Sequence, residues 1–185
     1  MHLLAAIGGV VALVSHAFWI WGIVSNRMHL NLATWLLWAL IDITILLSSI
    51  AAGASAPFLA VGFAGGAVAV ALTLLFKGTW QWGRLESVCA ILAIVCLILW
   101  FVGGPLIALV SLTLGKYIIA GIPTLRSAYK NPEWIQAYVW WLGSFGAATN
   151  IFAAGSWTLE QSFFPTVALL FTAIAGLINF RRLIA

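Results

Sequence analysis

Charged residues are scarce in this chain. Only 8 Lys and Arg and 4 Asp and Glu occur among its 185 residues, or 6%, whereas an ordinary soluble domain has about 25%. A water-facing surface of the usual kind is therefore excluded. The basic residues are also too few to form the patch that nucleic-acid binding requires, so we expect no nucleic-acid partner.

Cysteine and histidine are rare as well, with two and three residues. Cys89 and Cys96 would lie roughly 10 Å apart along a helix, which is beyond disulfide reach. They are interpreted as packing residues. The chain offers no His and Cys spacing typical of a metal site, no Ser-His-Asp set and no phosphate-binding loop. We therefore expect neither an enzyme nor a bound metal or cofactor.

Long hydrophobic runs are abundant instead, since 64% of the residues are hydrophobic. The runs are about 17 to 22 residues long, the length of a helix that crosses a bilayer. The first run has no basic segment before it and is long enough to span, which favours a retained helix over a signal peptide. The seven runs are Leu3–Val24, Leu32–Ala52, Pro57–Phe76, Ser87–Gly103, Leu106–Ile122, Gln136–Ala154 and Phe164–Phe180.

The basic residues outside the runs follow the first, third, fifth and seventh runs, and so all fall on one side. A basic excess marks the cytoplasmic side. We therefore expect a multi-pass protein of the cell (inner) membrane, in contact with the lipid bilayer, with its N-terminus outside and its C-terminus in the cytoplasm. Most Trp residues near the ends of the runs, Trp19 among them, are expected in an interfacial belt. The basic residues on this side are Arg27, Lys77, Arg84, Arg126, Lys130, Arg181 and Arg182.

The first and last thirds of the chain show a weak internal repeat. Trp38 matches Trp140 at an offset of 102 residues (140 minus 38), and residues 51–53 match residues 153–155 at the same offset. The fourth run then connects two units of three helices, which keeps the two units parallel about an axis along the membrane normal. We expect a first three-helix repeat at 1–78, a linker helix at 79–104 and a second three-helix repeat at 105–185.

Residues 122–133 read IPTLRSAYKNPE, a helix end containing Pro123 that is followed by a basic loop. In this segment, and in its 3+1+3 arrangement, the chain resembles the SWEET/PQ-loop superfamily of small transporters, with Thr124 in place of the glutamine. The resemblance implies two three-helix bundles that move by alternating access, with Pro123 as a hinge. It also implies a sugar-like, amino acid or vitamin solute, bound between the bundles by Trp and Asn side chains. Trp38, Trp140 and Asn150 fit that description.

Three ionisable residues lie inside the runs. At ~1.5 Å per residue, Asp42, His16 and Lys116 are roughly 15, 12 and 9 Å from the cytoplasmic ends of their helices. An unpaired charge in the hydrocarbon costs ~2.5–3.5 kcal/mol on insertion scales. We therefore expect Asp42 to pair with Lys116 between the two repeats, and His16 and Asp42 to be candidates for proton linkage. The alternative is a static ion pair that fixes helix register.

Helical spacing places further polar and aromatic residues beside these groups. Trp38 and Asp42 share one face with Trp35 and Ser49, and Trp140 shares another with Ser144. These faces predict a lined site, although close helix packing gives the same pattern. The expected solute-binding residues are Trp38, Asp42, Lys116, Trp140, Ser144 and Asn150.

We therefore expect a transporter of a small polar solute. A non-transporting structural or accessory subunit of a membrane complex is the alternative. The sequence also allows the chain to form a homo-oligomer. A retinal protein is disfavoured, because its Schiff-base lysine is on the last helix whereas Lys116 is on the fifth.

Overall fold

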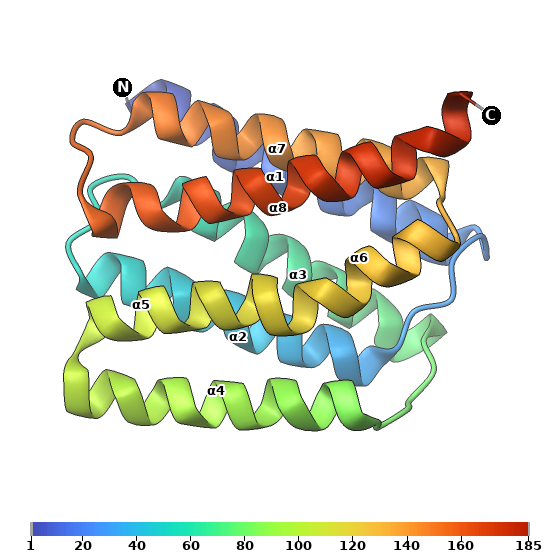
Figure 1. Cartoon of the computed structure of the whole chain (residues 1–185). Coiled ribbons are helices and arrows are strands. Elements are labelled where there is room, and N and C mark those ends of the chain that lie inside the picture. Colours follow the sequence, from blue (N-terminus) through green and yellow to red (C-terminus); the bar gives the residue numbers. More distant parts are fainter. Residues whose placement is uncertain (1, 185) are drawn as a thin grey trace.

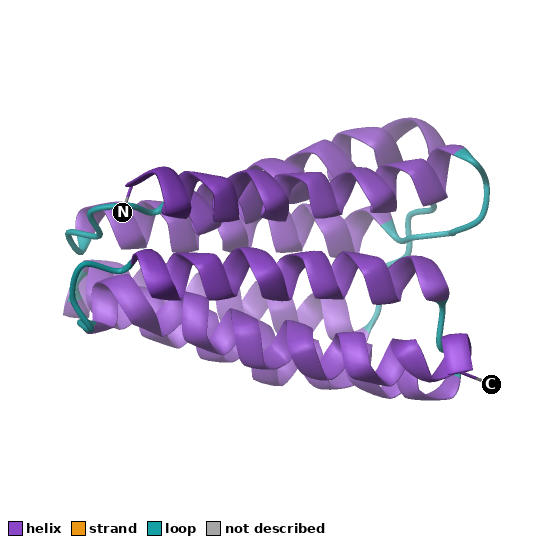
Figure 2. Cartoon of the chain, turned by 90° about the horizontal axis from the view of Figure 1, so that it is seen from above, coloured by secondary structure: helices purple, strands orange, loops and turns teal. Residues whose placement is uncertain are grey.

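A computed structural model describes residues 2–184 and is helical throughout, with no strand in that range (Figure 1). Turns and short loops join the helices (Figure 2). The elements are α1 (His2–Val24), α2 (Leu32–Ala51), α3 (Phe58–Lys77), α4 (Arg84–Gly103), α5 (Pro105–Leu114), the π-helix η1 (Gly115–Ala120), α6 (Gly121–Lys130), α7 (Trp134–Ala153) and α8 (Leu159–Ile184).

Five helices in the described part are long and apolar enough to cross a membrane: α1, α2, α3, α4 and α8. They coincide with five of the expected runs. The expected run Leu106–Ile122 falls in a helical stretch made of α5, η1 and α6, of which Pro105–Ile118 is apolar. The expected run Gln136–Ala154 corresponds to α7, which is as long as α2 but carries more aromatic residues. The chain therefore has the features of a multi-pass membrane protein.

The helices pack in a defined order. α3 packs against both α1 and α2, and α8 packs against α7 on one side and against α5 and α6 on the other. Helices α1–α3 thus form a first group, and α5–α8 form a second. Contacts between the two groups run mainly from α1 to α7 and from α2 to α5. α4 forms an outer row beside α5 and α2 (Figure 1).

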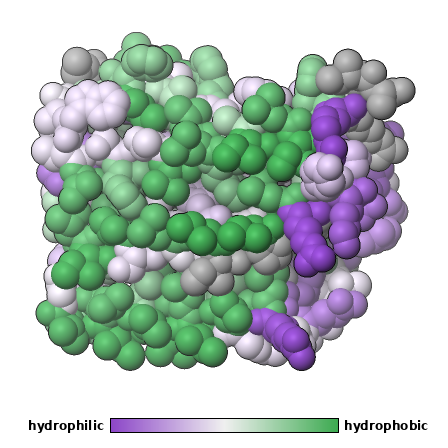
Figure 3. Space-filling model, viewed as in Figure 1, coloured by the Kyte–Doolittle hydropathy of each residue, from purple (hydrophilic) through white to green (hydrophobic). Residues whose placement is uncertain are grey.

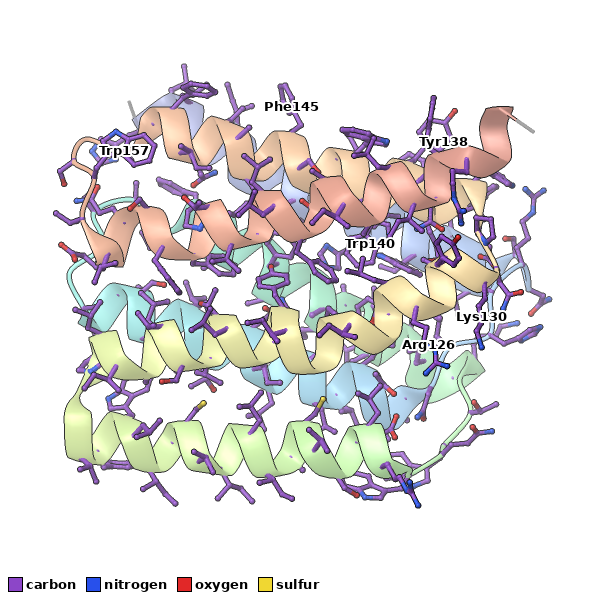
Figure 4. The ribbon with its side chains drawn as sticks, viewed as in Figure 1. Arg126, Lys130, Tyr138, Trp140, Phe145 and Trp157 are labelled. Atoms are coloured by element: carbon purple, nitrogen blue, oxygen red, sulfur yellow. The ribbon has the colours of Figure 1, made fainter. Side chains whose placement is uncertain are left out.

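The surface is hydrophobic along the helices and polar at one end. Hydrophilic residues gather at the end where α8 finishes, opposite to the end where α1 begins (Figures 1 and 3). Arg126 and Lys130 lie there, whereas Trp157 lies in the loop at the other end (Figure 4). We refer to these as the basic end and the opposite end. A hydrophobic surface along the helices suits a molecule surrounded by lipid.

Small residues bring α1 close to its neighbours. A Cβ atom added at Gly8 would come within 3.0 Å of the Gly146 carbonyl oxygen of α7, and one at Gly62 of α3 would come within 3.0 Å of the Gly9 carbonyl oxygen. Membrane helices use such residues because lipid supplies no hydrophobic force to pull them together. These contacts fix α1 between α3 and α7.

Side chains fasten the loops at the basic end. The Asn31 side chain caps α2 by accepting from the Ala33 N–H at 3.2 Å, and it donates to the Gln81 carbonyl at 2.7 Å. The buried Glu86 carboxylate accepts from Asn31 Nδ2 at 2.9 Å, from the Gly83 N–H at 2.9 Å and from the Thr34 hydroxyl. The beginning of α4 is thereby held against the beginning of α2.

Candidate functional site

Asp42 of α2 and Lys116 of η1 form an ion pair through Oδ1 and Nζ, and both side chains are 2% exposed. The expected pairing is confirmed. The two residues are 74 positions apart, and they join the first group of helices to the second. Because an unpaired charge is costly in this setting, each residue depends on the other.

Aromatic rings surround the Lys116 ammonium. Nζ lies 5.1 Å from the ring centroids of Trp38, Phe63 and Tyr117. The negative faces of aromatic rings attract a cation at this distance. The ammonium therefore sits in a cage of three rings closed by the Asp42 carboxylate. Trp38 was expected at the site; Phe63 and Tyr117 were not.

His16 of α1 lies beside the pair. Its Nδ1 is 2.8 Å from the Ala12 carbonyl oxygen. A carbonyl oxygen only accepts, so Nδ1 carries a hydrogen and Nε2 of the neutral ring is an acceptor. The ring packs edge-on against Phe63, with the centroids 5.7 Å apart. A Cβ atom at Gly66 would overlap the imidazole, so Gly66 makes room for this side chain.

These groups enclose a cavity of about 20 Å³, which is room for about one water molecule. We call it the ion-pair cavity. Its boundary toward the basic end is a layer of four indole rings, which we call the tryptophan layer. Trp19 lies 5.6 Å from Trp35 and 6.0 Å from Trp140 between ring centroids, and Trp35 lies 6.2 Å from Trp38.

A larger cavity of about 270 Å³ lies on the other side of the tryptophan layer, toward the basic end, and is partly open. We call it the vestibule. Its lining is mostly apolar, which is typical of pockets for small molecules. Besides the four Trp residues, its lining residues are Leu30, Thr34, Leu85, Thr124 and Gln136.

Trp19 does not lie in an interfacial belt. Its side chain is only 7% exposed and forms part of the tryptophan layer. The residue is three positions after His16 on α1, so the two share a helix face and both turn inward. The expectation of a belt position for Trp19 was wrong, because distance from the helix end does not determine which face a residue occupies. Trp80, Trp82 and Trp157 are exposed near the ends of helices.

A third cavity, of about 30 Å³, lies toward the opposite end. Ser49 of α2 and Asn150 of α7 line it, together with Glu160. Asn150 Nδ2 donates to the Ala5 carbonyl of α1 at 3.2 Å and to the Gly146 carbonyl at 3.1 Å. Asn150 therefore lies away from the ion pair and fastens α7 to α1.

The other expected residues lie at or near the ion-pair cavity. Trp140 points into the bundle, whereas Tyr138 and Phe145 of the same helix point outward (Figure 4). Its Nε1 is buried without a hydrogen-bond partner in the described structure. Ser144 does not line the cavity; its hydroxyl is 2.9 Å from both the Trp140 carbonyl and the Thr172 hydroxyl. Thr172 does line it.

Lys116 lies in the π-helical segment η1. Such segments are less regular than an α-helix and occur often at functional sites. Pro123 follows three residues after η1, within the backbone of α6, and it has no N–H to donate to Ile119. The side chain of Pro123, the expected hinge, lies outside the described residues.

Phe63, Gly66, Tyr117 and Thr172 belong to the site but were not expected there. The spacing of Gly62, Phe63 and Gly66 on one face of α3 was a usable signal for a helix that lies close to α1. Tyr117 is next to Lys116 in sequence, and both residues lie in η1. Comparison with known proteins adds no further assignment: no family model, no curated protein and no solved structure matches the chain.

Proposed function

We propose that the protein is a membrane transporter that moves a small polar solute by alternating access. Helices α1–α3 would form one bundle, α5–α8 the second and α4 the linker, with the N-terminus outside and the C-terminus in the cytoplasm. This is the arrangement that the SWEET/PQ-loop resemblance implies. The solute would bind at the ion pair, between the two bundles.

One observation carries the proposal: three cavities follow one another along the same helix faces. On α2, Trp35 lines the vestibule, Asp42 lines the ion-pair cavity and Ser49 lines the cavity at the opposite end. On α7, Gln136 and Asn150 line the first and the third of these cavities, and Trp140 lies between them. A wide cavity on one side of a buried ion pair and a narrow one on the other are compatible with a transporter that is open to one side.

The packing order also supports two similar bundles. In each, the third helix packs against the first and the second: α3 against α1 and α2, and α8 against α5–α6 and α7. The main contacts between the bundles would exchange under a two-fold rotation, since α1 with α7 would then correspond to α5 with α2. Trp38 and Trp140, which match in the repeat, are equivalent in this scheme.

The test is transport by the purified chain alone in proteoliposomes. Counterflow of labelled sugars, amino acids and vitamins should identify a transported solute, and Asp42→Asn and Lys116→Gln should each abolish its uptake while leaving membrane insertion intact. Lys130→Gln, which changes an exposed lysine outside the site, is the matched control.

Normal uptake by both site variants would contradict the proposed site. Absence of uptake for every solute, together with co-purification of other chains in fixed ratio, would favour the accessory-subunit alternative.

A further inference from the structure

The charges at the candidate site cancel. Asp42 and Lys116 are buried against each other, and within the described part of the chain no further Lys, Arg, Asp or Glu lines the ion-pair cavity or the vestibule. His16 is the remaining titratable residue of the cavity lining, and it makes its hydrogen bond to the backbone of its own helix. A solute that binds here has to keep this balance.

The balance discriminates between solutes by their charge. A cation that pairs with Asp42 displaces Lys116 and leaves a buried ammonium unpaired, and an anion that pairs with Lys116 does the same to Asp42. A solute with one ammonium and one carboxylate gives both residues a new partner. One uncompensated charge in such surroundings weakens binding about 100-fold.

Neutral polyols find few partners at this site. The polar side chains of the vestibule are Thr34, Thr124 and Gln136, and the rest of its lining is indole or leucine. Recognition of a sugar requires many hydrogen-bonding groups held around its hydroxyls. An apolar or aromatic side group matches this lining better, because it buries against the rings.

Lys116 has a means of leaving Asp42. It lies in η1, where the backbone departs from α-helical geometry, and a change between π and α geometry turns the side chains of the segment. The rings of Trp38, Phe63 and Tyr117 keep the ammonium stabilised while it moves. The pair can therefore open for a solute that enters from the vestibule.

We propose that the site binds an apolar zwitterion, an α-amino acid with an aliphatic or aromatic side chain. Its ammonium pairs with Asp42 and its carboxylate pairs with Lys116. Its side group displaces rings of the tryptophan layer, which separates the ion pair from the vestibule, and extends into the vestibule. The vestibule of about 270 Å³ is slightly smaller than typical drug-sized pockets of roughly 300–1,000 Å³, which suits a solute of this size. The assignment rests on the proposed function, because it names the solute class of that same site.

Matched ligands test the assignment by calorimetry on the purified full chain. L-phenylalanine is compared with phenethylamine, which lacks the carboxylate, and with 3-phenylpropionate, which lacks the ammonium. L-leucine, 3-methylbutylamine and 4-methylpentanoate form a second set with a smaller side group. We expect the amino acid to bind about 100-fold more tightly than either half in at least one set. The assignment is overturned if, in both sets, a half-molecule binds as tightly as its amino acid. It is also overturned if neither amino acid binds.

Variants of the pair should invert this preference. Asp42→Asn leaves Lys116 alone and should favour 3-phenylpropionate, whereas Lys116→Gln leaves Asp42 alone and should favour phenethylamine. If a single variant does not fold, the double variant Asp42→Asn/Lys116→Gln removes both charges and should bind L-phenylalanine about 100-fold more weakly. Unchanged preference in the variants that fold overturns the assignment. Lys130→Gln is the control and should match the natural chain.

Transport separates this assignment from the proposed function. Counterflow of D-glucose without binding of either amino acid would overturn the zwitterion assignment and leave the transporter proposal standing. Charge-selective binding without counterflow of any solute would overturn the transporter proposal and leave the zwitterion site standing. Neither binding nor counterflow would overturn both.

Discussion

Asp42 and Lys116 stabilise the folded chain only as a pair, because neither can be hydrated at its position. Removing one partner of a buried ion pair leaves the other charge without compensation, whereas removing both leaves a polar but uncharged site. The contribution of the pair is therefore non-additive, and it can be measured apart from any transport assay.

We expect Asp42→Asn or Lys116→Gln alone to lower the free energy of unfolding by about 3–5 kcal/mol. The double variant should be more stable than either single variant. Unfolding of the three variants in detergent micelles gives the coupling energy directly. Additive effects of the two substitutions would show that the residues do not depend on each other.

Gly66 is the residue that makes room for the His16 ring beside α3. A methyl group there would overlap the imidazole ring, whereas a methyl group at the neighbouring Gly65 would lie 3.6 Å from Leu13 Cδ1, an ordinary contact distance. The two adjacent glycines therefore differ in what a side chain would meet.

We expect Gly66→Ala to cost about 1–3 kcal/mol, as overpacking usually does, and Gly65→Ala to be close to neutral. Thermal unfolding of the two variants measures the difference. The double variant Gly66→Ala/His16→Ala should recover most of the loss, because the added methyl group then fills the place of the imidazole. Failure of His16→Ala to rescue would mean that the methyl group strains something other than His16.

At the scale of elements, the Glu86 carboxylate links the beginning of α4 to the beginning of α2. Glu86 accepts hydrogen bonds from Asn31, Thr34 and Gly83. A hydrogen bond to a charged group contributes about 1.5–3 kcal/mol. The Glu86 side chain thus joins the loop before α2 to the loop before α4, in addition to the hydrogen bonds between Asn31 and Gln81 and between Leu32 and Thr79.

We expect Glu86→Ala to speed amide hydrogen exchange in residues 28–34 and 79–86 by at least about tenfold, the factor that corresponds to 1.4 kcal/mol. Glu160→Ala removes a carboxylate at the opposite end and should leave these segments unchanged. The exchange of these segments in both variants is measured by mass spectrometry of their peptides. Unchanged exchange in the Glu86 variant would show that contacts other than those of Glu86 hold the beginning of α4.

The sequence predicts elements and charges better than contacts. The runs of apolar residues locate the helices because hydrocarbon requires them, and the Asp42–Lys116 pair follows from the cost of leaving either residue unpaired. The places of Trp19 and Phe63 could not be predicted in this way: the chain has 11 Trp and 11 Phe, and lipid accepts such rings as readily as the core does. The π-helix depends on the packing of α4, α5 and α8 around it, which no periodicity records. Asn150 was expected at the solute site because of its residue type. Its hydrogen bond to the Ala5 carbonyl of α1 depends on how the helices pack and could not be predicted from the sequence.

For the whole molecule, the orientation in the bilayer decides which side the vestibule faces. The basic residues gather at one end (Figure 3), and a basic excess favours the cytoplasm. The vestibule would then be accessible from inside the cell.

We expect single cysteines to report this orientation in a background with Cys89→Ser and Cys96→Ser. A membrane-impermeant maleimide should label Ser156→Cys on intact cells and His29→Cys only after permeabilisation, since both positions are exposed at different ends. The reverse pattern would invert the proposed orientation.

The neutrality of the Asp42–Lys116 pair also bears on the energetics of a complete cycle. A membrane potential acts on a moving elementary charge with about 2.3 kcal/mol per 100 mV. A carboxylate and an ammonium that move together carry no net charge, so the membrane potential does no net work on them. Voltage across the bilayer should therefore neither drive nor slow the step in which the bundles change sides, and concentration gradients alone would set its direction.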